Sequence, residues 1–294
     1  MDSTRTEHQD AFEDHRRALL GAAYRVLGTV ADSEDAVQET WLRWQKVDLA
    51  AVRDPRAYLL AAVTRTALNI VRSRDRRREE YIGPWLPEPV STDVAADPGR
   101  AAEVADEISL ALLVVLESLS PLERAAFVLR EVFALPYPEV ADTLERSEVS
   151  VRQLVSRARA HVRERTPRHP ADASTHRALT TAFLEAAEGR TPLAELVEVL
   201  SPEVVLTTDA GGRAKAALRP IRGIGKVLPF IAGVLAKPEV EALSWAIHEV
   251  NGRPALVGHE GTRVDCVVWI EADGAVTTRI DMVRNPEKLG AVRL

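Results

Sequence analysis

Apolar residues recur at three- and four-residue spacing along the first part of the chain, for example at Leu19, Ala23 and Val26. This period places such residues on one face of a helix. Acidic residues at positions 32–35 begin a further helix, because negative charge is favourable at the positive end of the helix dipole. The pattern therefore predicts an all-α domain over residues 8–78, which ends in one long basic helix.

Four prolines interrupt this periodicity within residues 79–103, which are predicted to be a linker because proline-rich segments cannot continue a helix. Helical spacing returns over residues 104–166, with breaks at Ser120-Pro121 and at positions 136–138. The second block is thus a second all-α domain. A further breaker cluster at residues 166–170 ends it.

Period-two alternation replaces the helical pattern in the last part of the chain. Asn251-Gly252 and Asp273-Gly274 are strong hairpin signals, each flanked by β-rich segments. Helices are expected at about 174–189, 191–200 and 223–235, around a short strand at 203–208. The fold class predicted is multidomain: two all-α domains, followed over residues 172–294 by an α+β domain with a curved antiparallel sheet.

Composition narrows the class of protein. The 294 residues are 46% hydrophobic and 28% charged, which argues against disorder, and no apolar run reaches the length of a bilayer span. The polar N-terminus does not resemble a secretory signal, so a cytoplasmic protein without a membrane partner is expected. Cys266 is the only cysteine, which excludes an intrachain disulfide and a multi-cysteine zinc site. Neither a metal nor a cofactor is predicted.

The net charge of −6 is unevenly distributed. Residues 43–78 contain ten basic and three acidic side chains, and residues 146–168 contain seven arginines and two acids. Two local basic patches are typical of proteins that bind nucleic-acid phosphates.

The second patch coincides with a helix-turn-helix pattern over residues 137–159. Val140, Ala141 and Leu144 form the apolar face of the first helix, and Ser147 is the expected N-cap of the second. The apolar face of the second helix is expected to comprise Val149, Val151, Leu154, Val155 and Ala158. Its polar positions are of residue types that reach base edges and phosphates in a major groove: Ser150, Arg152, Gln153, Ser156, Arg157 and Arg159. An ordinary corner between two helices is the alternative.

The first patch combines a loop at residues 46–55 with the long basic helix that follows it. A positive track next to a loop could hold single-stranded DNA with unstacked bases. A solvated basic helix is the alternative interpretation.

These residues resemble a known family, the extracytoplasmic-function sigma factors of RNA polymerase. Residues 32–44 are similar to the helix of region 2 that docks on the coiled coil of the polymerase β′ subunit, which points to Asp35, Gln38, Glu39 and Arg43. Residues 58–72 are similar to the segment that reads the melted −10 element, and the DNA-contacting residues expected there and in the preceding loop are Arg53, Arg56, Arg65, Asn69 and Arg72. Residues 120–131 resemble the start of region 4, and residues 137–156 its −35 reader. The partners implied are core RNA polymerase, through the β′ coiled coil and the β flap, and promoter DNA, as −35 duplex and −10 single strand.

A narrower resemblance is to the sigma factors that carry a C-terminal SnoaL-like domain. Residues 81–89 resemble the linker signature of that group, and residues 209–213 and 285–289 resemble two motifs of its extension. The resemblance implies that the extension modulates activity in place of a separate anti-sigma protein. The interdomain residues expected are Trp85, Leu86, Pro87, Asp209, Gly211, Gly212, Arg213, Asn285, Pro286, Lys288 and Leu289. A stiff proline spacer and a plain glycine turn are the alternatives.

The C-terminal domain contains residue types that serve acid–base catalysis in SnoaL-like enzymes. They are His248, His259, Asp265 and Asp281, with Trp245 and Trp269 as possible pocket walls. No defined dyad is evident, and a fold does not imply catalysis. The chain is therefore predicted not to be an enzyme and to have no catalytic residue. Two other functions stay open: a stand-alone DNA-binding regulator, and an enzyme fused to a DNA-binding module.

Overall fold

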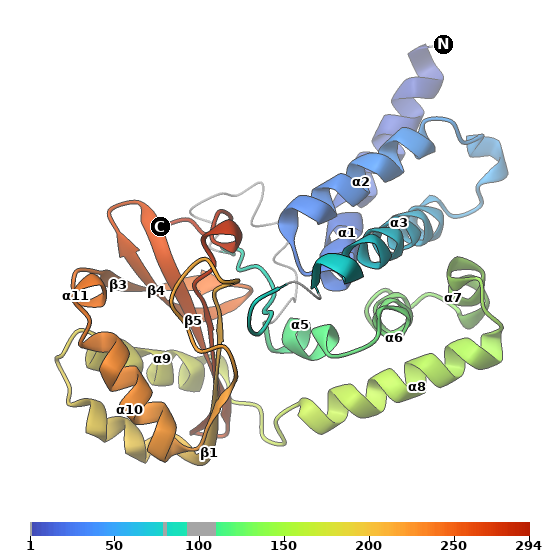
Figure 1. The fold of residues 1–294 in the computed structure, drawn as a ribbon. Coiled ribbons are helices and arrows are strands. Elements are labelled where there is room, and N and C mark those ends of the chain that lie inside the picture. Colours follow the sequence, from blue (N-terminus) through green and yellow to red (C-terminus); the bar gives the residue numbers. More distant parts are fainter. Residues whose placement is uncertain (1, 79–80, 93–109) are drawn as a thin grey trace. The chain divides into compact units, whose positions relative to one another are not determined.

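The computed structural model describes residues 2–78, 81–92 and 110–294 (Figure 1). These residues fold into two compact units. The helical unit contains residues 2–78 and 112–165, and the mixed unit contains residues 81–92 and 166–294. The described part of the predicted linker, residues 81–92, thus packs with the C-terminal domain. The rest of it, and the predicted start of the second helical domain at residues 104–109, lie outside the described residues.

Three long helices form the first half of the helical unit: α1 (Asp2–Leu27), α2 (Val30–Trp44) and α3 (Pro55–Arg78), with a short 3-10 helix η1 (Leu49–Ala51) before α3. Each packs on the other two. Phe12, Tyr24 and Trp44 are buried between them, and the Trp44 indole Nε1 donates to the His8 carbonyl at 2.9 Å. The indole is therefore buried without losing its hydrogen bond, which removes the main cost of burying a tryptophan.

Five further elements complete this unit: α5 (Leu110–Glu117), α6 (Pro121–Phe127), the π-helical turn η2 (Val128–Val132), α7 (Tyr137–Leu144) and α8 (Glu148–Arg165). Ser120 and Glu123 form a capping box that begins α6, and this helix start coincides with the break predicted at Ser120-Pro121. The buried Arg124 pairs with Glu117 and donates from Nη1 to the Val26 carbonyl at 2.8 Å. This bond ties α6 to the end of α1.

The mixed unit is built around a six-stranded sheet of order β2-β1-β6-β5-β4-β3. The strands are β1 (Leu200–Asp209), β2 (Ile221–Arg222), β3 (Ser244–Val250), β4 (Arg253–Glu260), β5 (Arg263–Asp273) and β6 (Val276–Val283). The other elements are the helices α9 (Ala173–Ala187), α10 (Ile224–Leu235) and α11 (Pro238–Glu241) and the 3-10 helices η3 (Leu193–Glu198) and η4 (Pro286–Lys288). The α+β class is confirmed.

Two expectations need correction. The sheet is mixed, because β1 pairs with β6 in parallel. Hairpin signals reveal only antiparallel neighbours in sequence, so a pairing between the first and last strands leaves no local trace. The helix expected at 191–200 is a 3-10 helix over Leu193–Glu198, and residue 200 already begins β1.

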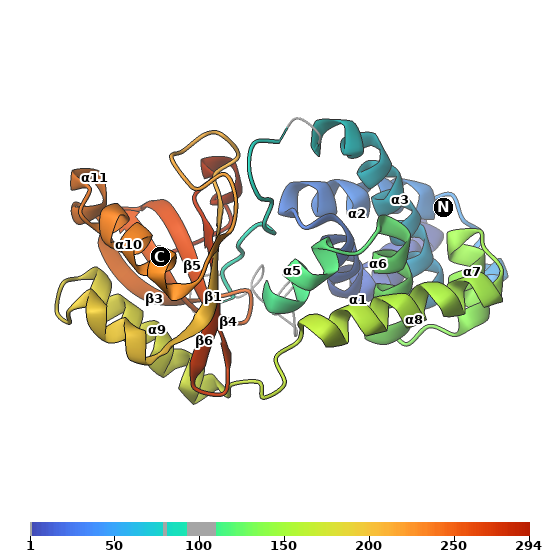
Figure 2. The same cartoon turned by 60° about the horizontal axis from the view of Figure 1, so that its bottom comes forward.

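Both predicted hairpins are present. Asn251 and Gly252 have φ values of +52° and +69°, the left-handed conformation that a two-residue turn between twisted strands requires. Figure 2 shows α9 and α10 beside the sheet. Their apolar residues pack with the strands in one core that includes Phe183, Leu206 and Ile280.

No helix within residues 2–78, 81–92 and 110–294 combines the length and apolar character that crossing a membrane requires.

Candidate nucleic-acid interface and linker clasp

The α7–α8 pair has the geometry of a helix-turn-helix. Glu145 ends α7 in the left-handed conformation, with φ +54° and ψ +48°, at the point where many such motifs have glycine. The Ser147 hydroxyl accepts from the Ser150 backbone N–H at 3.3 Å and so caps α8, as expected. The turn is therefore formed without glycine, at the modest cost of one strained residue.

The outer face of α8 carries the predicted DNA-reading residues. Buried apolar residues on its inner face fix its rotation: Val151, Leu154, Val155 and Ala158. Val149 was expected among these, but its side chain is 67% exposed. Val149 lies in the first turn of α8, before this helix packs against its neighbours. An apolar residue at this position is therefore not necessarily buried. Ser150 is half-buried, and the other predicted residues are exposed: Arg152, Gln153, Ser156, Arg157 and Arg159.

All three of these arginines have acidic partners within the helical unit. Arg157 Nε lies 2.7 Å from Glu123, Arg159 makes two contacts with Glu131, and Arg152 contacts Glu148 at 3.3 Å while stacking on the Tyr137 ring. The arginine side chains are 48–60% exposed. Exposed pairs of this kind contribute only about 0–1 kcal/mol each, so a phosphate could replace the carboxylate at little cost.

A second row of polar residues lies along α3. Arg65, Asn69 and Arg72 are spaced by four and three residues, so they share one helix face, and all three are exposed. Of the other two predicted residues, Arg53 is exposed before α3, and the Arg56 guanidinium lies 5.9 Å from the centroid of the Phe133 ring.

Arg65 already has a partner on α7. Its Nε donates to the Thr143 carbonyl at 3.2 Å, and Nη2 lies 3.5 Å from the Asp142 carbonyl. These carbonyls end α7, where a cation is favourable because the helix dipole is negative. Arg65 is thus engaged within the helical unit and would have to release α7 before it could contact DNA.

The predicted polymerase-binding residues are exposed on α2: Asp35, Gln38, Glu39 and Arg43. Their spacing places them on one face, and Glu39 and Arg43 form an ion pair there. Leu42 lies next to them and is 54% exposed. An apolar side chain among polar ones is typical of protein interfaces.

In the mixed unit, a buried ion pair holds the linker. Asp209 at the end of β1 is fully buried, and its Oδ2 lies 2.8 Å from the Lys288 ammonium. The same oxygen accepts from the Leu86 backbone N–H at 2.8 Å, and Lys288 donates to the Leu86 carbonyl at 2.6 Å. Both backbone groups of one linker residue are therefore bound to the two charged side chains. We call Asp209, Lys288, Tyr81, Trp85 and Leu86 the linker clasp.

Aromatic side chains complete the clasp. The Tyr81 hydroxyl donates to Asp209 and accepts from the Asn285 amide at 3.0 Å. Lys288 Nζ lies 3.1 Å from the centroid of the Trp85 ring, which is a cation–π contact made by a buried ammonium group. Burial and the hydrogen bond to the Asp209 carboxylate raise the pKa of Tyr81, so the neutral phenol is the donor.

The glycines of the first extension motif lie where the linker passes closest. A Cβ at Gly211 would lie 2.6 Å from the Asn285 amide nitrogen and 2.8 Å from the Tyr81 hydroxyl, and one at Gly212 would lie 2.9 Å from Ile82. Both have positive φ. Arg213 pairs with Glu287 at 3.0 Å on the surface, which links the two extension motifs.

The remaining predicted interdomain residues lie nearby. Pro87 and Leu289 are buried, and Pro286 is exposed at the start of η4. Further along the linker, Val90 and Asn251 exchange hydrogen bonds, and Ser91 bonds to the C-terminal tail at Ala291 and Arg293. The linker is thus held along residues 81–92.

Comparison with known proteins matches both halves of the helical unit to one family. Residues 11–77 match Sigma-70 region 2, and residues 109–162 match Sigma-70 region 4. The chain is 44% identical over 227 residues to the ECF RNA polymerase sigma factor SigJ of Mycobacterium tuberculosis, covering 77% of this chain and 72% of the relative. The chain belongs to the ECF RNA polymerase sigma factors.

Two further matches extend over nearly the whole sigma factor. The probable ECF RNA polymerase sigma factor SigI of Mycobacterium tuberculosis is 31% identical over 285 residues, covering 96% of this chain and 95% of the relative. The crystal structure of the extracytoplasmic function sigma factor SigJ from the same species superposes with a TM-score of 0.77 at 36% identity, covering 94% of this chain and 96% of that one. The predicted fold, two helical sigma regions followed by a SnoaL-like domain, is confirmed. Like its relatives, the sigma factor directs transcription initiation.

The acid–base candidates of the sigma factor are dispersed. His259 Nδ1 lies 2.8 Å from the Gly261 carbonyl oxygen, Asp265 pairs with Arg284, and Asp281 pairs with Arg279. His248 lies on β3, the edge strand. Burial raises the pKa of the Asp281 carboxyl, with Arg279 opposing this effect. Within the described residues, no group of three potential ligands that could hold a metal ion is present.

The two tryptophans expected as pocket walls differ. Trp245 lines an apolar cavity beside the sheet, whereas Trp269 donates to the Val250 carbonyl at 3.2 Å and is not among the residues that line this cavity. Side chains alternate between the two faces of the sheet along β5, so Trp269 lies on the other face from Val268, which lines the cavity. None of the four acid–base candidates belongs to the fifteen lining residues.

Sequence reasoning missed three contributors of the sigma factor. Leu42 on α2 and Val149 on α8 are exposed apolar residues on predicted interaction surfaces, and Tyr81 bonds to the buried Asp209. Tyr81 begins the linker signature, so the sequence contained a signal for it. Nothing local distinguishes the other two from core residues.

Proposed function

We propose that the helical unit of the sigma factor binds core RNA polymerase and the two promoter elements, while the mixed unit regulates it without catalysis. In this proposal α2 docks on the β′ coiled coil, α3 captures the melted −10 strand, and α8 reads the −35 duplex. Residues 112–165 also contact the β flap. The observation that carries the proposal is the exposed polar row on α8, held in a helix-turn-helix.

The α8 row supports duplex reading through its chemistry. Arginine and glutamine side chains form bidentate hydrogen bonds with guanine and adenine in the major groove. The pairs of Arg157 and Arg159 with Glu123 and Glu131 hold these side chains at the surface until phosphates replace the carboxylates.

The α3 row supports capture of a single strand. Its residues lie on the same helix as Tyr58, which is 42% exposed and could stack on an unpaired base. Arg65 is bonded to the end of α7, so we expect capture of the −10 strand to be coupled to separation of α7 from α3. The α2 face supports polymerase docking through four exposed polar residues around Leu42.

The linker clasp supports regulation by the mixed unit. Residues 81–92 lead toward region 4 along the chain, and the clasp binds their backbone to β1 and η4. A linker held in this way has a fixed path, whereas a free proline-rich linker would have only an extended one. Because no acid–base candidate lines the cavity, we assign no chemical step to this unit.

Transcription from a library tests the sigma activity. Full-length protein and bacterial core RNA polymerase are incubated with templates whose −35 and −10 positions are randomised, and transcripts are sequenced. We expect a defined promoter motif from the wild type and its loss in the double variant Arg152→Ala, Gln153→Ala. Arg263→Ala, an exposed arginine on β5, is the matched control. A wild-type protein that binds duplexes but never yields a promoter-dependent transcript would contradict the proposal.

Truncation before α9 tests the regulatory part. We expect removal of residues 172–294 to change transcript yield while duplex binding by α8 persists. The double variant Asp209→Ala, Lys288→Met, which removes both charged contacts to Leu86 without leaving one charge buried alone, should change yield in the same direction. Equal yields from all three proteins across the library would remove the regulatory claim.

A further inference from the structure

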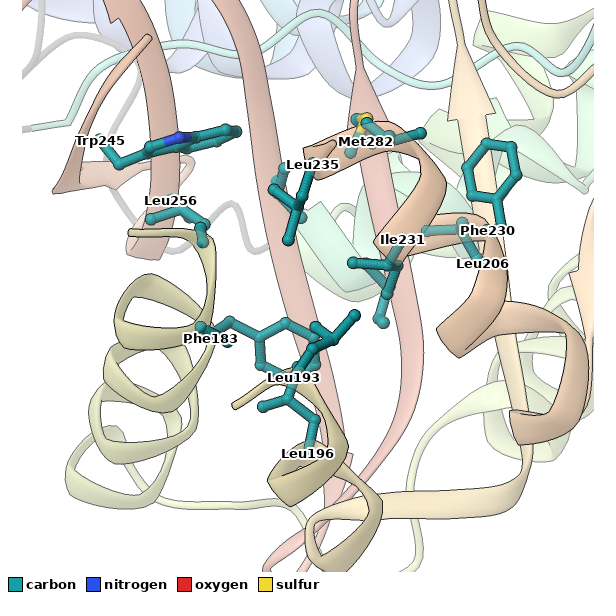
Figure 3. A pocket seen from close by; sticks show the side chains of 15 residues that line it. Phe183, Leu193, Leu196, Leu206, Phe230, Ile231, Leu235, Trp245, Leu256 and Met282 are labelled. Carbon is teal, nitrogen blue, oxygen red and sulfur yellow. The ribbon is translucent and has the colours of Figure 1, made fainter. Parts of the chain in front are cut away.

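The mixed unit contains a chamber whose wall consists only of apolar side chains. It lies beside the sheet, between α9, η3 and α10, and has a volume of about 60 Å³ (Figure 3). Phe183 of α9, Leu196 of η3 and Ile231 of α10 converge on it, and Trp245 and Met282 line it from β3 and β6. Elements that are distant in sequence thus line one apolar cavity.

The chemistry of this wall selects the occupant. All fifteen lining residues are apolar, so a charged group inside would lose its hydration without gaining a partner. Water is also disfavoured, because a buried water needs two to four polar partners. A cavity of about 150 Å³ lined by Leu, Ile and Phe stays dry and binds benzene. The chamber, at about 60 Å³, has the same kind of wall and must widen to hold such a ring.

A larger hollow adjoins the chamber. It has a volume of about 590 Å³ and shares Ala186, Ala187, Leu235 and Trp245 with the chamber wall. Its remaining lining includes Glu188, Glu241 and Ser244, so its outer part is polar. The two spaces therefore adjoin at these four residues, which we call the passage, and a ligand would reach the chamber past them from the outer hollow, which we call the vestibule.

The α10 wall can adapt to an occupant. Only Val227 of its twelve residues is fully buried, although most of the others are apolar. Pro229 interrupts its hydrogen-bond ladder, and the Cβ positions of Gly225 and Gly233 have no atom within 4 Å. Half-buried apolar residues such as Phe230 and Leu235 would bury more surface against a ligand, which is favourable.

We infer that this chamber binds a neutral apolar small molecule with an aromatic or short aliphatic body. The ligand enters through the vestibule and lies between Phe183 and Ile231, with Trp245 at the passage. Binding requires no charge on the ligand and involves no covalent step. The inference is independent of the transcriptional roles proposed above.

Methionine NMR provides a direct test, because the chain has only two methionines. Met282 lines the chamber and Met1 begins the chain. Full-length protein labelled with ¹³C-methyl methionine is titrated with toluene and, separately, with benzoate, which has a similar ring and a charge. We expect toluene to shift the Met282 methyl signal saturably, with a Kd at or below about 1 mM. Benzoate should leave this signal unchanged, and neither probe should move Met1.

Two chamber variants and one control sharpen the test. Ala187→Phe fills the passage and should abolish the toluene response. Leu193→Ala enlarges the chamber and should keep it. Leu218→Ala, which removes an exposed side chain outside the chamber, should respond like the wild type.

Three results would overturn the inference: no saturable shift of wild-type Met282 with toluene, an equal shift with benzoate, or loss of the response in Leu193→Ala. If Ala187→Phe fails to fold, the toluene titration of Leu193→Ala and the benzoate titration of the wild type still test the inference.

Discussion

Charged residues on α8 and in the linker clasp of this sigma factor differ in their exposure to solvent. On α8 the arginines are about half exposed and pair with carboxylates that solvent also reaches. In the linker clasp, Asp209 is fully buried and Lys288 is 5% exposed. Pairs of a basic and an acidic side chain are thus exposed on α8, where a phosphate can replace the carboxylate, and buried in the linker clasp, where they hold the linker in place.

The difference comes from solvation. A surface pair contributes little because water screens it, so its partners are free to exchange with phosphate. A buried pair contributes modestly while intact, but breaking it leaves a charge without water or partner, which costs several kcal/mol. The clasp is therefore suited to hold the linker, and α8 is suited to release its pairs on binding DNA.

The largest effect is expected from removing one member of the clasp. Asp209→Ala leaves the Lys288 ammonium buried without its carboxylate and should lower the free energy of unfolding of the mixed unit by about 3–5 kcal/mol. Urea unfolding followed by tryptophan fluorescence measures the change, and hydrogen exchange at the Leu86 amide should become faster. Glu260→Ala, which removes a carboxylate from an exposed pair, should cost about 0–1 kcal/mol.

The double variant Asp209→Ala, Lys288→Met separates charge burial from loss of contacts. Because no unpaired charge remains, part of the lost stability should return, although the Leu86 N–H and Tyr81 hydroxyl still lack their acceptor. A double variant as unstable as the single one would show that the ammonium is not the source of the cost.

The next effect concerns the surface pairs of α8. Gln153→Ala should weaken binding of the selected promoter duplex by about 1–3 kcal/mol and relax preference at one base pair. Arg157→Ala should weaken binding to all sequences alike and reduce the salt dependence by about one phosphate contact. Fluorescence anisotropy at several salt concentrations measures both. If Arg157→Ala instead destabilised the fold by more than about 1 kcal/mol, its pair with Glu123 would not be exchangeable.

A smaller effect is expected from the exposed apolar residue of α8. Val149→Ala removes two methyl groups that could contact a thymine methyl, so discrimination of thymine from uracil at one −35 position should fall by about 1 kcal/mol. Competition between duplexes with either base measures it. An unchanged fold is expected because Val149 is exposed, so urea unfolding serves as the control.

The smallest effect concerns a buried carboxyl outside the clasp. Burial raises the pKa of Asp281 above its ordinary 3.8, and its Oδ1 has no hydrogen-bond partner among the described residues. The folded state then holds this proton more tightly than the unfolded state, so stability from this group is greatest below pH 3.8 and falls as pH rises through the raised pKa. Asp281→Asn mimics the neutral form, so its stability relative to the wild type should increase as the pH rises from 3.8 through the raised pKa.

Urea unfolding at a series of pH values from about 4 to 8 measures this difference, which should grow with pH. Glu260→Gln, at an exposed carboxylate, should show a constant difference over the same range. A difference that shrinks toward pH 7 would mean that Arg279 outweighs burial at this site.

Much of the architecture could be predicted from local patterns. The helix-turn-helix, its Ser147 cap and both hairpins depend on residues close in sequence, and each is present. Val149 and the segment at 191–200 were assigned wrongly, because periodicity cannot tell an exposed apolar residue from a buried one or a 3-10 helix from an α-helix.

The site was predictable only in part. The motifs at residues 81–89, 209–213 and 285–289 were recognisable, but their spacing does not reveal that Asp209 and Lys288 bind both backbone groups of Leu86. The acid–base candidates share a domain without sharing a pocket, which alternation along single strands could not show.

The sequence by itself determined the family, the order of the domains, the basic patches and most secondary structure, because these depend on neighbours along the chain. Only the tertiary structure decided the parallel β1–β6 pairing, the engagement of Arg65 by α7, the linker clasp and the apolar chamber. Each of these joins residues dozens of positions apart. Whether such residues meet depends on how whole elements pack to bury apolar surface, a property that no local pattern contains.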